Sequence, residues 1–215
     1  MTTSRQIRGA LPADAEFLAR VLEMAGRGHL QRGPWDLMFP DPQERQVGLR
    51  RIVDGEARSW CHRDCFHVVD EDGEASAAMV AFEPSAIGGT SLTAPLFEAF
   101  AHLSWTTERI SQVGPMLEPY TRCLPDMPAG TWIVENVGAR ADKRRRGLVA
   151  ILLEHALEAG RELGFRRAQI SCLVGNDPAR MAYEKAGFEV VEELVDPAFE
   201  ALLGAPGFQR MTRTL

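Results

Sequence analysis

The sequence Lys143-Arg144-Arg145-Arg146-Gly147-Leu148-Val149-Ala150 joins two apolar runs of different period. The run before it, Trp132 to Ala139, reads as a β-strand, and the run from Gly147 to Gly160 reads as a helix. A chain that enters a helix through a basic, glycine-containing turn exposes backbone N–H groups that no helical carbonyl accepts. The helix dipole and the arginine charges both favour a bound anion there. The stretch therefore predicts a phosphate-binding turn.

Two well-known phosphate-binding turns use a similar strand, turn and helix, and neither matches this sequence. A nucleotide triphosphatase loop needs Gly-x-x-x-x-Gly-Lys followed by Ser or Thr, and a dinucleotide-binding turn needs Gly-x-Gly-x-x-Gly. Neither spacing occurs around the basic run. The ordinary alternative is a helix N-terminus beside a solvated run of charges, Lys143 to Arg146.

The turn instead resembles motif A of the GCN5-related N-acetyltransferases, Arg/Gln-x-x-Gly-x-Gly/Ala after a strand such as Ile133 to Ala139. In that family the turn holds the pyrophosphate of acetyl coenzyme A. The resemblance implies coenzyme contacts from Val137, Gly138, Ala139, Arg144, Arg145, Arg146, Gly147, Leu148, Val149 and Ala150. Val149 departs from the usual Gly or Ala, and its branched side chain could crowd the phosphate. We expect a slightly shifted ligand.

A second segment, Asn176 to Phe188, resembles the family's motif B, Asn-x-x-Ala-x-x-x-Tyr-x-Lys-x-Gly-Phe, with every named position filled. Asn176 or Asp177 can cap a helix, Pro178 suits its first turn, and Gly187 suits the left-handed residue that ends it. The pattern predicts a helix of about ten residues. The resemblance implies that Asn176 contacts the coenzyme.

Two residues are candidates for proton transfer. Tyr183 lies near the end of the motif B helix, where a phenol of pKa about 10 could protonate the departing coenzyme thiolate. Its ordinary alternative is a tyrosine packed beside Phe188. Glu135 lies on the strand before motif A, where relatives often carry a glutamate, and could accept the amine proton directly or through water. A purely structural glutamate is equally compatible with the sequence. Weaker candidates, in loops and in the insertion described below, are Asp36, Glu118 and Asp126.

Composition limits the classes of function. The chain has 215 residues and a net charge of −6, which argues against broad nucleic-acid affinity. No apolar stretch reaches the roughly 18 residues of a membrane span, and residues 1–9 lack the apolar core of a secretion signal. A cytoplasmic protein without a membrane partner is expected, and its four cysteines are not expected to form a disulfide framework.

The segment from Cys61 to His67 contains two thiols and two imidazoles, which raises the question of a zinc site. Structural zinc sites usually pair a Cys-x-x-Cys knuckle with a second ligand pair downstream, and neither is present. No metal is therefore expected, and Cys65 and His67 are interpreted as alternating along a strand. His155 is interpreted as a structural residue at the edge of the core.

The expected architecture is one α/β domain over residues 1–215. The resemblance implies a mixed, mostly antiparallel sheet flanked by helices, whose parallel fourth and fifth strands splay apart to admit the pantetheine arm. Strands are predicted at 5–10, 66–69, 75–82, 132–139, 167–174, 188–194 and 208–214, and a turn at 70–73. Helices are predicted at 12–26, 43–54, 147–160 and 177–186, with 28–42 a looser segment. An insertion at approximately 84–130 has a helical rhythm and predicts one or two further helices.

These observations predict direct acetyl transfer from acetyl coenzyme A to a primary amine, either a small molecule or a peptide. The motifs recognise the donor, so the acceptor stays open. A noncatalytic acyl-coenzyme-A sensor is the alternative, and a nucleic-acid-binding module is the weakest one. Relatives often pair, so a homodimer formed through the insertion is also open.

Overall fold

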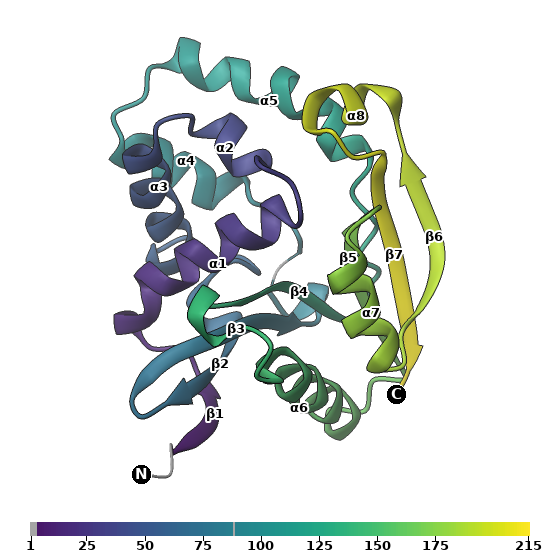
Figure 1. Ribbon diagram of the computed structural model, residues 1–215. Helices are drawn as coiled ribbons and strands as arrows, with labels where there is room; N and C mark the ends of the chain where they lie inside the picture. The colour runs from purple at the N-terminus through teal and green to yellow at the C-terminus, as the bar shows by residue number, and fades with distance from the viewer. Residues whose placement is uncertain (1–3, 88) are drawn as a thin grey trace.

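The computed structural model describes residues 4–87 and 89–215. Within these ranges the chain forms a central sheet with helices on both faces (Figure 1). The strands are β1 (Arg5–Gly9), β2 (Phe66–Glu71), β3 (Glu74–Phe82), β4 (Trp132–Ala139), β5 (Arg167–Leu173), β6 (Glu189–Val195) and β7 (Gly207–Thr214). The helices are α1 (Ala15–Arg27), α2 (Pro34–Met38), α3 (Pro42–Asp54), α4 (Thr93–His102), α5 (Thr107–Arg122), α6 (Leu148–Glu162), α7 (Asp177–Lys185) and α8 (Pro197–Leu203).

The strand order is β1-β2-β3-β4-β5-β7-β6. Strands β4 and β5 run parallel, and the other neighbouring strands in the described ranges run antiparallel. This confirms the expected mixed, mostly antiparallel sheet. The hairpin between β2 and β3 has a tighter turn than expected, because β2 continues to Glu71. Asp72 and Gly73, with φ of 56° and 89°, make the two-residue turn that suits the twist of a hairpin.

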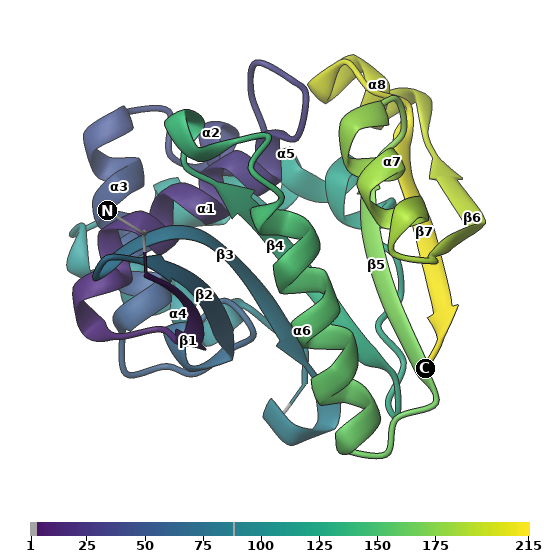
Figure 2. The same cartoon turned by 60° about the horizontal axis from the view of Figure 1, so that its bottom comes forward.

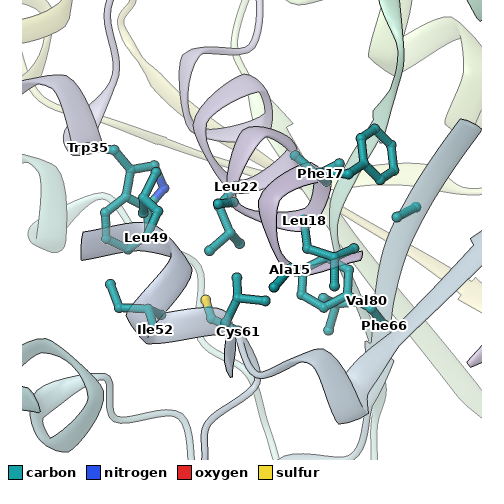
Figure 3. Packing of buried hydrophobic residues seen from close by; sticks show 14 of the residues in the cluster. Ala15, Phe17, Leu18, Leu22, Trp35, Leu49, Ile52, Cys61, Phe66 and Val80 are labelled. Atoms are coloured by element: carbon teal, nitrogen blue, oxygen red, sulfur yellow. The ribbon is translucent and has the colours of Figure 1, made fainter. Parts of the chain in front are cut away.

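One face of the sheet is covered by α1 and the helices packed on it. The predicted apolar stripe of α1 is buried, and its members are Phe17, Leu18, Val21 and Leu22. They meet Leu49 and Ile52 of α3 and Val80 of β3 in one cluster (Figure 3). Fully burying such a side chain contributes about 1.5–3 kcal/mol, so this cluster fixes α1 and α3 against the sheet.

The opposite face is covered by α6 and α7, and Figure 2 shows α6 lying across it. Leu152, Leu153 and Ala156 of α6 are buried against the sheet. The indole N–H of Trp132 donates to the carbonyl oxygen of Ala156 at 2.8 Å. This bond joins the start of β4 to α6, the helix that follows β4 in the chain.

The predicted insertion between β3 and β4 is helical and contains α4 and α5. Helix α4 packs on α3, and the C-terminal end of α5 lies beside α8 (Figure 1). An ion pair of 3.0 Å between Arg122 and Asp196 holds α5 to the start of α8. The sequence did not predict α8, which has only seven residues. It is supported locally by the Asp196 carboxylate, which accepts the N–H of Ala198 at 2.7 Å.

Two further expectations differ from the structure. The looser segment after α1 contains the short helix α2, because Asp36 accepts the N–H of Gly33 at 2.8 Å and Pro34 suits the first turn. The expectation that Cys65 and His67 alternate along one strand is wrong. Cys65 ends a 3-10 turn that begins at Arg63, and β2 begins only at Phe66.

Candidate functional site

The parallel strands β4 and β5 separate shortly after they meet. They pair only between Trp132–Val134 and Ala168–Ile170, although β4 continues to Ala139 and β5 to Leu173. Figures 1 and 2 show the half of the sheet formed by β5, β7 and β6 turned away from the half formed by β1 to β4. This confirms the splayed central strands. Backbone groups that border the gap need partners, which an amide-bearing ligand can supply.

A β-bulge in β4 lies where the divergence begins. The register with β3 shifts by one residue between Glu135 and Gly138, and Asn136 has a left-handed φ of 51°. The extra residue reverses which side chains face each side of the sheet. Glu135 therefore shares the α1 side with Ile133, whereas Ala139 faces the α6 side.

Glu135 lies at the point where the two strands part. Its carboxylate accepts a hydrogen bond of 2.9 Å from the Ser171 hydroxyl of β5. Burial raises the pKa of Glu135 to about 7, although hydrogen bonds from Ser171 and from the Asn136 backbone N–H lower it. A carboxyl group that titrates near neutral pH is suited to accepting a proton from an amine.

Cys61, in the segment that raised the question of a zinc site, lies close to Glu135. Cys61 is fully buried, and the side-chain amide of Asn136 approaches its sulfur at 3.8 Å. Burial raises the pKa of the Cys61 thiol well above its usual value, so it stays neutral. His62 and Asp64 are both paired with Arg58. In the ranges that the structure describes, no three His, Cys, Asp or Glu side chains are placed to hold a metal ion.

Tyr183 of α7 lies on the other side of the sheet from Glu135. The residue is 7% exposed, and its side chain belongs to the cluster of Cys172 and Phe188 beneath α6 and α7. Burial raises the pKa of its phenol, and the nearby Cys172 and Glu135 raise it further. The phenol therefore keeps its proton at neutral pH. The two residues singled out for proton transfer flank the gap between β4 and β5.

Tyr120, the other of the chain's two tyrosines, lies near Glu135 and was not expected to be a site residue. Its ring stacks on Phe199 of α8 at a centroid distance of 5.8 Å and meets Phe208 of β7 edge-on at 5.6 Å. Burial raises the pKa of its phenol, with Glu135 and Cys61 raising it further. No local motif marks Tyr120, because its position depends on how α5 packs.

The basic turn lies at the N-terminus of α6. Gly147 caps the helix in a left-handed conformation, with φ of 76° and open space where a Cβ would lie. The backbone N–H groups of Gly147, Leu148, Val149 and Ala150 have no acceptor among the described residues. They project from the positive end of a fifteen-residue helix, which is an arrangement that favours an anion.

The arginine side chains of this turn have different surroundings. Arg146 pairs with Glu71 of β2 at 3.1 Å, and Lys143 approaches the same carboxylate at 3.9 Å. All three arginines are exposed, but Arg144 and Arg145 form no ion pair with the described residues. Arg146 and Lys143 thus anchor the turn to β2, and Arg144 and Arg145 are better placed to meet an incoming anion.

Four other positions of the expected coenzyme site can be located. Val149 packs with Val137 against the cluster beneath α6, so the structure accommodates its departure from the family pattern by packing. Ala139, also in that cluster, is buried at the end of β4. Gly138 faces α1, where an added Cβ would lie 3.2 Å from Val21. Gly138 therefore permits the close approach of α1, and any contact from it to a ligand must come from its backbone.

Asn176 begins α7, but its side chain makes no capping hydrogen bond. The side-chain amide lies beside the end of α1, 3.0 Å from where a Cβ on Gly28 would be. The expected left-handed residue after the helix is present, because Gly187 has φ of 82°. The Asn176 amide is thus not used to cap its own helix, and its contact with coenzyme stays a prediction.

The weaker carboxylate candidates are less suited to proton transfer. Asp36 is hydrogen-bonded to Arg27 at 2.9 Å, and Glu118 pairs with Arg122 at 3.2 Å. Asp126 is exposed near the end of the insertion. Of the four carboxylates considered, Glu135 is the one that lies where β4 and β5 part.

His155 of α6 has a structural environment, as expected. Its Nε2 lies 3.2 Å from Nδ1 of His67 on β2. Burial lowers the pKa of His67 to about 4, and the neighbouring His155 lowers it as well. The pair is therefore part of the packing between α6 and the sheet.

Comparison with known proteins gives the family. The chain matches the acetyltransferase (GNAT) family over residues 35–188 and belongs to it. A search of curated proteins finds no match. The described helices include none that is both long enough and apolar enough to cross a membrane.

Solved structures share the fold at low sequence identity. An N-acetyltransferase from Staphylococcus aureus Mu50 superposes with a TM-score of 0.67 at 17% identity, covering 97% of this chain and 100% of that one. A GCN5-related N-acetyltransferase from Kribbella flavida gives 0.58 at 15% identity, covering 98% of each chain. The Drosophila melanogaster polyamine N-acetyltransferase, described as forming N-acetylagmatine, gives 0.55 at 15% identity and covers 99% and 100%. The chain thus has the GNAT fold, with acetyltransferases as structural neighbours.

Proposed function

We propose that this protein transfers an acetyl group from acetyl coenzyme A directly to a primary amine. The observation that carries the proposal is the placement of Glu135 and Tyr183 on opposite sides of the gap between β4 and β5. A thioester in that gap would have a proton acceptor on one side and a proton donor on the other. Family membership supports acetyl transfer in general.

The donor would be held at two places along one path. The free N–H groups from Gly147 to Ala150 would bind the pyrophosphate, with Arg144 and Arg145 adding charge. The pantetheine arm would then run between β4 and β5 and form hydrogen bonds to the backbone of Val137 and Ala139, beyond the point where β4 stops pairing with β5. An N–H near Val137 would also polarise the thioester carbonyl and stabilise its oxyanion.

The chemistry requires two proton movements. The amine nitrogen attacks the thioester carbon, the C–S bond breaks, and the nitrogen gives a proton to Glu135 directly or through water. The leaving thiolate takes a proton from Tyr183. Burial disfavours a charge on the phenol and on the thiolate alike, so transfer between them exchanges one buried anion for another. Each turnover ends when solvent moves a proton from Glu135 back to Tyr183.

The experiment is a thiol-release assay with acetyl coenzyme A and a panel containing spermidine, phenethylamine, lysine and an alanyl peptide. Glu135→Gln and Tyr183→Phe should each lower kcat by about 10²–10⁴-fold, the usual contribution of a general base or acid. Coenzyme affinity by calorimetry should stay close to wild type in both. Glu193→Gln, an exposed glutamate on β6, is the matched control and should leave kcat unchanged.

Different failures have different meanings. Unchanged kcat in Tyr183→Phe would show that Tyr183 is not the general acid. Unchanged kcat in Glu135→Gln would show that Glu135 is not the general base. Coenzyme binding without thiol release for any amine would instead favour the acyl-coenzyme-A sensor. No heat on mixing with acetyl coenzyme A would overturn the proposal that this molecule is the acetyl donor.

A further inference from the structure

The last turn of α5 is held against the C-terminal part of the chain by aromatic contacts. The Tyr120 ring lies between Phe199 and Phe208, which are themselves edge-to-face at 5.5 Å. The ion pair between Arg122 and Asp196 fixes the same contact from outside. Such aromatic pairs contribute about 0.5–1.5 kcal/mol each beyond their buried area, so the position of Tyr120 is well defined.

This aromatic group lies on the same side of the sheet as Glu135. Phe208 pairs across the sheet with Leu173 of β5, and Leu173 is two residues beyond Ser171. Residues two apart on a strand face the same side and are about 7 Å apart. Ser171 donates to Glu135 at 2.9 Å, and the Tyr120 phenol lies close enough to Glu135 for the carboxylate to raise the pKa of the phenol. The aromatic group and the Glu135 carboxyl group therefore share one neighbourhood.

The ionisable and polar groups in this neighbourhood are few. The Ser171 hydroxyl and the Asn136 N–H meet the Glu135 carboxylate. The thiols of Cys61 and Cys172 and the phenols of Tyr120 and Tyr183 lie close enough to interact with it. On α5 and before α8, the charges of Glu118, Arg122 and Asp196 satisfy one another. In the described ranges, none of the charged partners seen at Glu135 is a cation, so shielding from water dominates its environment.

We propose that Tyr120 is a positioning residue for Glu135. The Tyr120 ring, held by Phe199 and Phe208, excludes water from the Glu135 carboxyl group. The inserted segment would thereby set the basicity of a residue on β4. A carboxyl group kept from water favours its neutral form and titrates at higher pH. The inference rests on the proposed function only in giving Glu135 a role as base, because the shielding itself needs no substrate.

The test is carbon-13 NMR titration of the protein labelled at the glutamate carboxyl carbons, with the Glu135 signal identified by its absence in Glu135→Gln. The wild-type midpoint should be about 7. Tyr120→Phe keeps the ring and should keep the midpoint. Tyr120→Ala and Tyr120→Gln admit water and should lower the midpoint by at least about one pH unit, a tenfold change in the proton equilibrium. Circular dichroism identifies which variants fold, and the longer glutamine side chain serves if alanine does not.

A wild-type midpoint near 4.5, the usual glutamate value, would overturn the inference. So would an unchanged midpoint in the variants that lack the ring. A midpoint shift in Tyr120→Phe equal to that in Tyr120→Gln would also overturn it, because the hydroxyl and not the ring would then be responsible. The proposed function fails separately, if Glu135→Gln turns over normally whatever the carboxyl titration shows.

Discussion

Replacing Gly147 by alanine should lower both the stability of the protein and its affinity for coenzyme, and a matched control variant separates the two effects. Gly147 has φ of 76°, and no atom lies within 4 Å of where its Cβ would be. In the free protein the substitution therefore costs only the left-handed backbone penalty, roughly 1–2 kcal/mol. For a chain of this size that penalty should lower Tm by about 2–8 °C.

Gly164→Ala is the matched control, because Gly164 follows the other end of α6. It has φ of 84° and also has open space around the missing Cβ, so its strain should be similar. The two positions are separated by the length of α6, about 22 Å at 1.5 Å per residue. Both variants should lose similar stability, and only one should lose coenzyme affinity.

The expected affinity loss follows from the free N–H groups at the turn. A Cβ on Gly147 projects into the space beside them and should cost at least one hydrogen bond to phosphate, worth about 1.5–3 kcal/mol for a charged partner. Calorimetry with acetyl coenzyme A should therefore give a Kd raised by about 10–150-fold for Gly147→Ala. Gly164→Ala should bind like wild type. Equal Kd values in the two variants would refute the phosphate-binding turn.

Three further predictions concern Glu135 and the core. Because the folded pKa of Glu135 is about 7 against the ordinary 4.5, ionisation destabilises the fold, and wild type should lose stability as the pH rises between these values. The stability of Glu135→Gln relative to wild type, by urea unfolding, should accordingly increase by about 3 kcal/mol between about pH 4 and pH 8. A difference between the two proteins that does not depend on pH would contradict this. Ser171→Ala removes a hydrogen bond that favours the charged carboxylate, so its carbon-13 titration should move to higher pH; a shift to lower pH would count against the assignment. Gly33→Ala would place a Cβ 2.4 Å from the carbonyl oxygen of Gly26 and should lower the free energy of unfolding in urea by about 1–3 kcal/mol. The control Gly9→Ala has open space around the added Cβ and should lose little stability. Similar losses of stability in the two variants would show that the contact at Gly33 relaxes freely.

The sequence predicted the elements whose signals are local. The α1 stripe, the hairpin and the α7 helix follow from apolar spacing and turn residues, and their bounds agree within three residues. The basic turn was also predictable, since Gly147 and the free N–H groups belong to one continuous stretch. Glu135 could be proposed because it lies on the strand that precedes that stretch, at a place where relatives often carry a glutamate.

Other features depend on contacts between distant segments and left no local signal. Tyr120 reaches the neighbourhood of Glu135 only because α5 packs on α8, and α8 is too short for its apolar residues to show a period. The partner of Arg146 could not be predicted either, because Glu71 comes from a different strand. The bulge at Asn136 was missed because a left-handed asparagine within an apolar run looks like an ordinary strand residue.

The extra residue in β4 matters for anyone who recombines this protein with a relative. A crossover that deleted Asn136 but kept the residues on both sides of it would turn the side chains of the rest of the strand to the opposite face of the sheet. A bulkier neighbour of Gly138 would then face α1 in its place. The chain would also leave β4 toward α6 from the wrong face of the sheet. Chimeras should therefore exchange residues 132 to 150 as one cassette, with its register intact.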